Sequence, residues 1–319
     1  MKVAMNEPSI IENDYKINSK LDGGSRLVLG TSSLGGVWEE VDKQESVEAI
    51  QYALNEGVEV IDTAPSYNRA QEFVGKALNR WEGPLPFIST KIGRLQAEKA
   101  DEVYLDYSPE GMRKSIEESL DLLGVDYIDL LFLHEPQLVP IEEIDTILDT
   151  LHSFQDEGIV GMLGIGGNPD SKFWPYVDNN HFDVVSTFLK MDACTLEGFN
   201  LDIPRYRNKE LIIYAASSLH MGLLGSHFEP YIQNPPDDNW IQRTHVENAI
   251  QVNEIAQQNG MSLTSLSLRY LFSIEEADRV VLGPQNLDEV KDSLNSWKKG
   301  PLEEDIFNQV TNILSPSCS

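Results

Sequence analysis

The chain has few cysteines and no long apolar run, and these two features exclude disulfide-rich and membrane-spanning classes of protein. Its 319 residues include 2 cysteines, too few for a disulfide framework. The longest apolar stretch, Ile128 to Leu133, is far shorter than the roughly 20 residues that span a membrane. The segment from Met1 to Lys20 lacks the basic and apolar regions of a secretory leader. We therefore expect a soluble, cytoplasmic protein.

Positive charge is scarce as well. The chain carries 52 acidic side chains against 24 lysines and arginines, which gives a formal net charge of −28. Such a field repels phosphate backbones, so no nucleic-acid partner is expected, and the acids are interpreted as a solvated surface. The 6 histidines show neither His-x-His nor His-Glu-x-x-His spacing. The sequence therefore predicts no metal site.

A dinucleotide fingerprint of the Gly-x-Gly-x-x-Gly kind is also missing. The nearest match, Gly164-Ile165-Gly166-Gly167, lacks the final glycine spacing. This absence disfavours a Rossmann fold, in which the fingerprint follows the first strand. What the chain does contain is a regular alternation of strand and helix patterns.

Eight short and nearly continuous apolar segments have the pattern of strands. They are residues 27–31, 58–62, 85–90, 127–133, 159–165, 182–189, 211–214 and 279–282. Apolar strands separated by helices are typical of a parallel sheet that is buried on both faces. Eight such units predict a single-domain (β/α)8 TIM barrel. We place the barrel at residues 25–319, after a polar N-terminal segment at residues 1–24.

Local signals mark where several helices begin. Asp42 and Ser108 are candidate N-caps, and Pro109 follows at the first helical position. Further helices are expected over residues 140–158, in a pair over 244–272, and over 287–297 and 303–314. The stretch from Ser217 to Thr244 is expected to be irregular, and loops of that length are usually functional. Since it follows the seventh strand, we expect a binding loop there.

Polar residues with related chemistry end three consecutive strands. Asp62, Lys91 and His134 end the second, third and fourth strands, and Tyr67 follows Asp62 in the next loop. Barrel enzymes carry their catalytic residues at the C-terminal ends of strands. Each residue alone has an ordinary structural interpretation, as a cap, a packing residue or a surface charge. Their joint occurrence favours a catalytic site.

The four side chains suit proton transfer to and from a substrate oxygen. A tyrosine has a reference pKa of about 10, and a neighbouring lysine ammonium lowers that pKa because it stabilises the phenolate. Asp62 would keep Lys91 charged and in place, and His134 would orient the substrate oxygen. Tyr67 is thus expected to act as general acid in reduction and as general base in oxidation.

Three segments resemble the signature of the aldo-keto reductases. They are Asp62-Thr63-Ala64-Pro65-Ser66-Tyr67, Ser89-Thr90-Lys91 and Leu133-His134, and the likeness extends from about Leu27 to Leu294. The resemblance implies a catalytic tetrad of Asp62, Tyr67, Lys91 and His134. It also implies NAD or NADP bound in an extended pose across the barrel mouth, without a metal ion.

Several cofactor positions depart from the family pattern. After the fifth strand, where the family has Ser-Asn, only Asn168 is left to hold the nicotinamide carboxamide. After the seventh strand, Ala216 stands in place of a stacking tyrosine. After the eighth strand, no basic residue precedes Lys291, whereas relatives have one there for the 2′-phosphate of NADP. Asp288 and Glu289 would repel such a phosphate, so the sequence favours NAD, with NADP as the alternative.

The resemblance implies the other contacts residue by residue. The residues expected at the cofactor are Gly30, Asn168, Ser217, Leu219, Gly222, Leu224, Gly283, Gln285, Asn286 and Glu289. The residues expected at the substrate are Trp38, Tyr67, His134, Phe228 and Tyr231.

The same departures, together with the stretch from Ser218 to Leu224, resemble the subgroup of L-galactose and L-fucose dehydrogenases. That likeness implies oxidation of the anomeric hydroxyl of a free sugar to a lactone with NAD. One alternative is an NADPH-dependent reductase of aldehydes or ketones. Another is a binding subunit that senses nucleotides. We expect a monomer or a small homo-oligomer.

Overall fold

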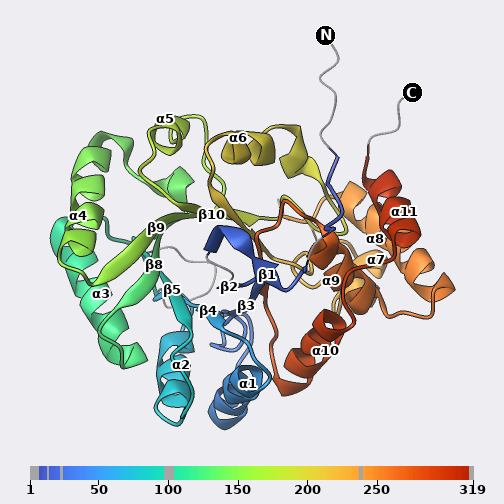
Figure 1. Cartoon of the computed structure of the whole chain (residues 1–319), viewed down its shortest axis with the longest axis horizontal. Coiled ribbons are helices and arrows are strands. Elements are labelled where there is room, and N and C mark those ends of the chain that lie inside the picture. Colours follow the sequence, from blue (N-terminus) through green and yellow to red (C-terminus); the bar gives the residue numbers. More distant parts are fainter. Residues whose placement is uncertain (1–6, 13, 22–23, 97–103, 237–239, 316–319) are drawn as a thin grey trace.

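The structure is a computed structural model that describes residues 7–12, 14–21, 24–96, 104–236 and 240–315. In that part of the chain, eight parallel strands form a closed barrel surrounded by helices (Figure 1). The barrel strands are β3 (Leu27–Gly30), β4 (Val60–Asp62), β5 (Phe87–Ile92), β8 (Ile128–His134), β9 (Val160–Gly166), β10 (Val184–Phe188), β11 (Ile212–Ala216) and β12 (Arg279–Leu282). The last strand closes the barrel by pairing with the first, where Val280 stands opposite Leu27. The predicted (β/α)8 barrel is confirmed.

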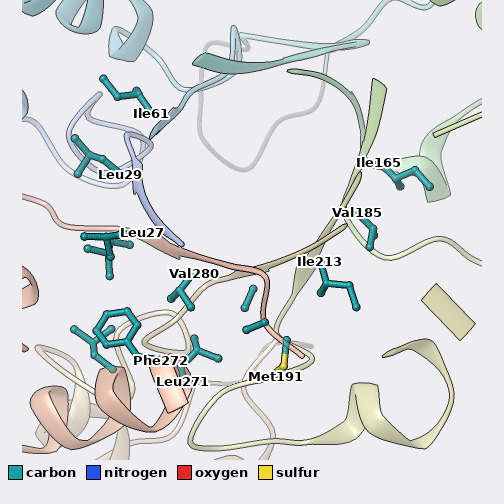
Figure 2. Close-up of a cluster of buried hydrophobic side chains, with 14 of the residues drawn as sticks. Leu27, Leu29, Ile61, Ile165, Val185, Met191, Ile213, Leu271, Phe272 and Val280 are labelled. Atoms are coloured by element: carbon teal, nitrogen blue, oxygen red, sulfur yellow. The ribbon is translucent and has the colours of Figure 1, made fainter. Parts of the chain in front are cut away.

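The strands are apolar throughout because both of their faces are buried. Alternate side chains point into the barrel, where they form an inner cluster of Val28, Val60, Leu130, Phe132, Val184, Ile212, Tyr214 and Val281. The intervening side chains point outward to the helices. Figure 2 shows Leu29, Ile61 and Val280 on this outer side, with Leu271 and Phe272 of α9 (Leu263–Ser273) below Val280. A half-exposed sheet would instead alternate apolar and polar residues.

The two helices with a predicted N-cap begin where the sequence predicts. Asp42 accepts a hydrogen bond from the backbone of Glu45 and caps α1 (Lys43–Asn55). Ser108 caps α3 (Pro109–Leu123) from the residue before Pro109, as expected. The other long helices are α2 (Ala70–Leu78), α4 (Ile144–Asp156), α8 (Arg243–Gln258), α10 (Leu287–Lys298) and α11 (Glu304–Leu314).

The short helices are where the sequence pattern fails. α5 (Trp174–Asp178) and α6 (Asp202–Asn208) were not expected, and each contains a proline. The stretch 217–244 is not irregular throughout, because it contains α7 (Phe228–Gln233). Helix α4 begins later than expected, after a 3-10 turn at Ile141–Glu143. Helices of five to seven residues are too short to repeat an apolar face, so periodicity does not reveal them.

The N-terminal segment packs against the barrel. β1 (Ile17–Asn18) and β2 (Gly24–Ser25) form an antiparallel pair that lies over the centre of the barrel in Figure 1. Leu21 between them packs against the inner cluster. This pair covers the N-terminal ends of the strands, so the opposite end of the barrel remains for the predicted catalytic residues. Within the described residues, no helix has the length and apolar character needed to cross a membrane.

Candidate active site

Asp62 and Lys91 form a buried ion pair between neighbouring strands. The Nζ atom of Lys91 lies 2.6 Å from Oδ2 of Asp62 and donates a second hydrogen bond to the carbonyl of Thr63 at 3.0 Å. The other carboxylate oxygen, Oδ1 of Asp62, accepts the Ser89 hydroxyl at 2.7 Å. Asp62 is the register partner of Ser89, and Lys91 is two residues further along the same strand face. The carboxylate is therefore held by two side chains of β5.

The ammonium of Lys91 is stabilised in its charged form. Burial lowers the pKa of Lys91, but the charges of Asp62 and Tyr67 and their hydrogen bonds raise it by more, so the net shift is upward. Its Nζ lies 4.8 Å from the centroid of the Tyr67 ring. A fixed positive charge thus stands beside the phenol, as the sequence predicts.

The phenol of Tyr67 departs from expectation in one respect. Burial raises its pKa, Lys91 lowers it and Asp62 raises it, and the net shift is upward. The expected net lowering of the Tyr67 pKa is therefore wrong, because the effect of burial on this pKa is larger than that of the Lys91 charge. At neutral pH the phenol is protonated, which is the form that donates a proton to a carbonyl oxygen.

His134 faces Tyr67 from the end of β8. The two rings are nearly perpendicular, with their centroids 6.1 Å apart. Burial, followed by the charges of Lys91 and Arg94, holds the pKa of His134 well below its usual value. The imidazole is therefore neutral, and its buried Nδ1 has no hydrogen-bond partner among the described residues. An unpaired buried polar atom calls for an explanation, and a ligand bound beside Tyr67 would supply one.

Two groups around the tetrad escaped the sequence prediction. Arg94 and Glu135 form an ion pair of 2.7 Å beside His134. The charge of Arg94 opposes the upward shift of the Tyr67 pKa and adds to the downward shift of the His134 pKa. The hydroxyl of Tyr107 donates to the carbonyl of His134 at 3.0 Å and so holds the end of β8. The sequence does not reveal these two contacts, because the residues in each pair lie far apart in the chain.

Some of the expected cofactor residues also have packing roles in the barrel. Leu224 is 0% exposed and lies in the hydrophobic core, so its side chain has no face for a cofactor. A Cβ on Gly30 would stand 2.5 Å from the carbonyl oxygen of Leu282, so the close approach of β12 requires this glycine. Neither observation bears on a contact through the backbone, so the cofactor roles of Gly30 and Leu224 stay predictions. The Asn168 side chain binds both backbone groups of Phe188, at 2.7 and 3.1 Å, which leaves one N–H and one lone pair for a carboxamide.

The loop after β11 contains tight turns. Ser217 and Gly222 both have positive φ values, 59° and 85°, so the backbone turns sharply here. Leu219 in the same turn is half-buried against the core. Tight turns of this kind direct backbone groups outward. The roles of these three residues remain predictions.

The segment after β12 carries two carboxylates. The Gln285 side chain donates to Glu39 at 2.8 Å, and its backbone N–H donates to Glu289 at 2.9 Å. Asn286 caps α10 through the backbone of Glu289. Gly283 is exposed and has open space where a Cβ would stand. Glu39 was not anticipated, because it lies in the loop after β3 at the start of the chain.

The aromatic residues expected at the substrate divide into two groups. Trp38 is 50% exposed and makes an edge contact with Trp240, which makes another with Phe188 at the end of β10. These rings lie at the C-terminal end of the barrel. Phe228, by contrast, is buried in the core, and Tyr231 packs against the same core. The expectation that Phe228 contacts the substrate is corrected, because packing covers its ring.

One group outside the tetrad has metal-binding side chains. Among the described residues, the ligand atoms of Asp192, Cys194 and His220 lie within 4.8 Å of one another. A hydrogen bond of 2.7 Å joins Asp192 to His220, and one of 2.8 Å joins His220 to His245. The other oxygen of Asp192 accepts the backbone N–H of Cys194. Because the carboxylate and imidazole atoms are already paired within the protein, we interpret this group as structural.

Known proteins are similar to this chain in sequence and in fold. The chain matches the model of the aldo/keto reductase family over residues 26–315. It is 30% identical over 292 residues to D-arabinose 1-dehydrogenase of Saccharomyces cerevisiae, with 86% of this chain and 83% of the relative covered. It is 26% identical over 305 residues to L-galactose dehydrogenase of Arabidopsis thaliana, with 92% and 91% covered. A solved glycerol dehydrogenase from Gluconobacter oxydans has the same fold, with a TM-score of 0.74 at 22% identity over 98% and 96% of the chains.

The family match includes every strand of the barrel and all four residues of the tetrad. The two relatives are covered over most of their own length, so the likeness is not confined to one motif. Aldo/keto reductases interconvert hydroxyl and carbonyl groups with a nicotinamide cofactor. The chain belongs to this aldo/keto reductase family of oxidoreductases.

Proposed function

We propose that the protein is an NAD-dependent dehydrogenase that oxidises the anomeric hydroxyl of a free aldose to a lactone. The ion pair of Asp62 and Lys91 beside Tyr67 carries the chemical part of this proposal. The sugar substrate is supported by the two relatives, whose names are those of aldose dehydrogenases. The preference for NAD is supported by the carboxylates around Gln285.

In oxidation, the anomeric hydroxyl loses a proton from oxygen and a hydride from carbon. The bound nicotinamide supplies the hydride acceptor. The Tyr67 phenolate accepts the proton, and the Lys91 ammonium stabilises that phenolate through charge. Asp62 keeps the ammonium in place at 2.6 Å. The neutral His134 imidazole binds the sugar oxygen and holds it toward Tyr67, because it offers one donor and one acceptor nitrogen.

The residues present fit a nicotinamide dinucleotide. Gly283 leaves open space at the end of β12, and the turn from Ser217 to Gly222 lies after the neighbouring strand β11. These segments would hold the adenosine and pyrophosphate parts of the cofactor. Glu39 and Glu289 both hydrogen-bond to Gln285, where a 2′-phosphate would meet two negative charges. A 2′-hydroxyl can instead donate to a carboxylate, so this arrangement favours NAD.

The rings of Trp38 and Trp240 suit a sugar. Both are about half exposed, at 50% and 47%, and their edge contact places them together at the C-terminal end of the barrel. Sugars present apolar C–H faces that stack on such rings. We expect Trp38→Ala to raise KM for the aldose while kcat changes little.

The test follows NADH formation by absorbance with purified protein, a panel of free aldoses, and NAD or NADP in parallel. NADH formed from galacto-configured or 6-deoxy sugars supports the proposal. If only NADPH is consumed, and only with aldehydes or ketones, the enzyme is a carbonyl reductase and the proposal fails. Tight cofactor binding without turnover of any substrate would instead support a nucleotide-sensing subunit.

A further inference from the structure

A cavity lies at the end of the barrel opposite the tetrad, beneath the β1–β2 pair. Its volume is about 410 Å³, within the range of small-molecule sites. The residues that line it are Lys20, Leu21, Gly24, Ser25, Glu59, Val60, Phe87, Met162 and Arg279. Val60, Phe87 and Arg279 are the first residues of their strands, which places the cavity at the N-terminal end of the barrel.

Arg279 is the distinctive group of this cavity. Its side chain is only 2% exposed, yet it forms no ion pair with a carboxylate of any described residue. Its one hydrogen bond to the described chain runs from Nη1 to the Tyr214 hydroxyl at 2.5 Å. Its Nε is buried without a partner. Since a guanidinium does not deprotonate in a protein, a full positive charge is buried here.

The surroundings of Arg279 compensate this charge only in part. Its guanidinium carbon lies 4.6 Å from the centroid of the Phe87 ring and 5.3 Å from that of Tyr214, so both aromatic faces stabilise the cation. The nearby acid Asp129 forms no ion pair with Arg279, and its Oδ2 accepts the backbone N–H of Ile88 at 2.8 Å. A buried charge without a counter-ion is strongly unfavourable. An anion from solution would remove that penalty.

The rest of the cavity suits such an anion. Lys20 brings a second positive charge to the lining and also contacts Asp278 at 3.4 Å. The Ser25 hydroxyl accepts a hydrogen bond from Leu27 at 3.1 Å, so its own hydrogen is available to a ligand. A Cβ on Gly24 would stand 3.2 Å from Nη2 of Arg279, so glycine lets the β1–β2 pair approach the guanidinium closely.

We propose that this cavity binds a small oxyanion, a phosphate or carboxylate group, between Arg279 and Lys20. Guanidinium groups bind the oxygens of both anions in pairs, and a second cation strengthens either. The exposed Glu59 at the same cavity disfavours highly charged ligands. The cavity volume leaves room for a small metabolite that carries the anionic group. This site is separate from the tetrad and does not depend on the proposed substrate.

The experiment is thermal unfolding of the full chain by calorimetry at constant ionic strength. Inorganic phosphate or malonate replaces chloride in steps, and an anion that binds the folded state raises Tm along a saturating curve. The variants are Lys20→Gln and Arg279→Met, with Lys114→Gln on the exposed face of α3 as a matched control. We expect Lys20→Gln to weaken the apparent anion affinity roughly tenfold, and Arg279→Met to abolish the response.

The outcomes separate the alternatives. A response to phosphate alone supports a phosphoryl ligand, and a response to malonate alone supports a carboxylate ligand. An equal response in wild type, Lys20→Gln and Lys114→Gln would overturn the proposal, because the anion would then bind elsewhere, such as the cofactor loops. No response beyond that to chloride would overturn it too. If Arg279→Met does not fold, the anion response of the exposed Lys20→Gln variant still tests the proposal.

Discussion

The two ends of the barrel bury cations in opposite ways. At the C-terminal end, Lys91 lies 2.6 Å from Asp62, and its charge is neutralised within the protein. At the N-terminal end, Arg279 is equally buried but has aromatic rings in place of a carboxylate. A cation that is paired internally can act on a third group, here the phenol of Tyr67. A cation that has no paired carboxylate among the described residues instead favours an anion from solution.

The largest expected effect at the tetrad end is catalytic. Tyr67→Phe removes the proton-transferring hydroxyl, so kcat should fall about 10²- to 10⁴-fold. The ring and the ion pair remain, so NADH affinity measured by fluorescence titration should stay close to wild type. Arg279→Met, at the other end, serves as the contrast and should leave kcat nearly unchanged. Undiminished activity in Tyr67→Phe would refute the tetrad assignment.

Stability should distinguish the two cations directly. Lys91→Met leaves Asp62 buried and unpaired, so the free energy of unfolding should drop by about 3–5 kcal/mol. Adding Asp62→Asn should recover part of that loss. Arg279→Met leaves no ion-paired carboxylate behind among the described residues. Removal of a buried charge offsets the lost bond to Tyr214, so the loss should not exceed about 1 kcal/mol in chloride. Denaturant titration measures all three, and equal losses at both ends would contradict the comparison.

The pH dependence follows from the raised pKa of Tyr67. Oxidation requires the deprotonated phenol, so kcat/KM for the sugar should rise about tenfold per pH unit below that pKa and level off above it. Reduction requires the protonated phenol, so it should be flat at neutral pH and fall only in the alkaline range. Initial rates in both directions across pH check this. An oxidation rate that is independent of pH would contradict the role of Tyr67.

The smallest expected effect concerns the carboxylates near Gln285. Glu39→Gln removes one negative charge and Gln285→Arg adds a positive one, so each should shift the NADP/NAD ratio of kcat/KM toward NADP. We expect roughly tenfold for the arginine, the value of one charge-assisted hydrogen bond. Glu40→Gln, on the neighbouring exposed acid, is the matched control. If the ratio does not move, this segment does not face the ribose.

The sequence predicts best what depends on strand order. The sequence places Asp62, Lys91 and His134 together because a parallel barrel gathers the C-terminal ends of its strands, and the structure brings these residues together. The predicted strand limits agree with the structure to within two residues, because a continuous apolar run in such a fold forms a buried barrel strand.

What escaped prediction depends on contacts between distant loops. Glu39 lies in a loop and Arg94 in the two-residue strand β6 (Arg94–Leu95), and periodicity reveals neither segment. The contact of Glu39 with Gln285 spans most of the chain. The sequence places Phe228 at the substrate, whereas its ring lies in the core. In a loop, the side to which a residue points depends on tertiary packing, and the sequence carries little trace of it.

The pairing of β12 with β3 has a consequence for folding during synthesis. Leu27 meets Val280 only after nearly the whole chain has been synthesised. Until then β3 keeps an open edge that can pair wrongly with other strands. Folding that waits for so distant a contact is slow, because a long loop must close first. We therefore expect the nascent chain, with its tetrad strands already made, to depend on protection from aggregation until the last strand arrives.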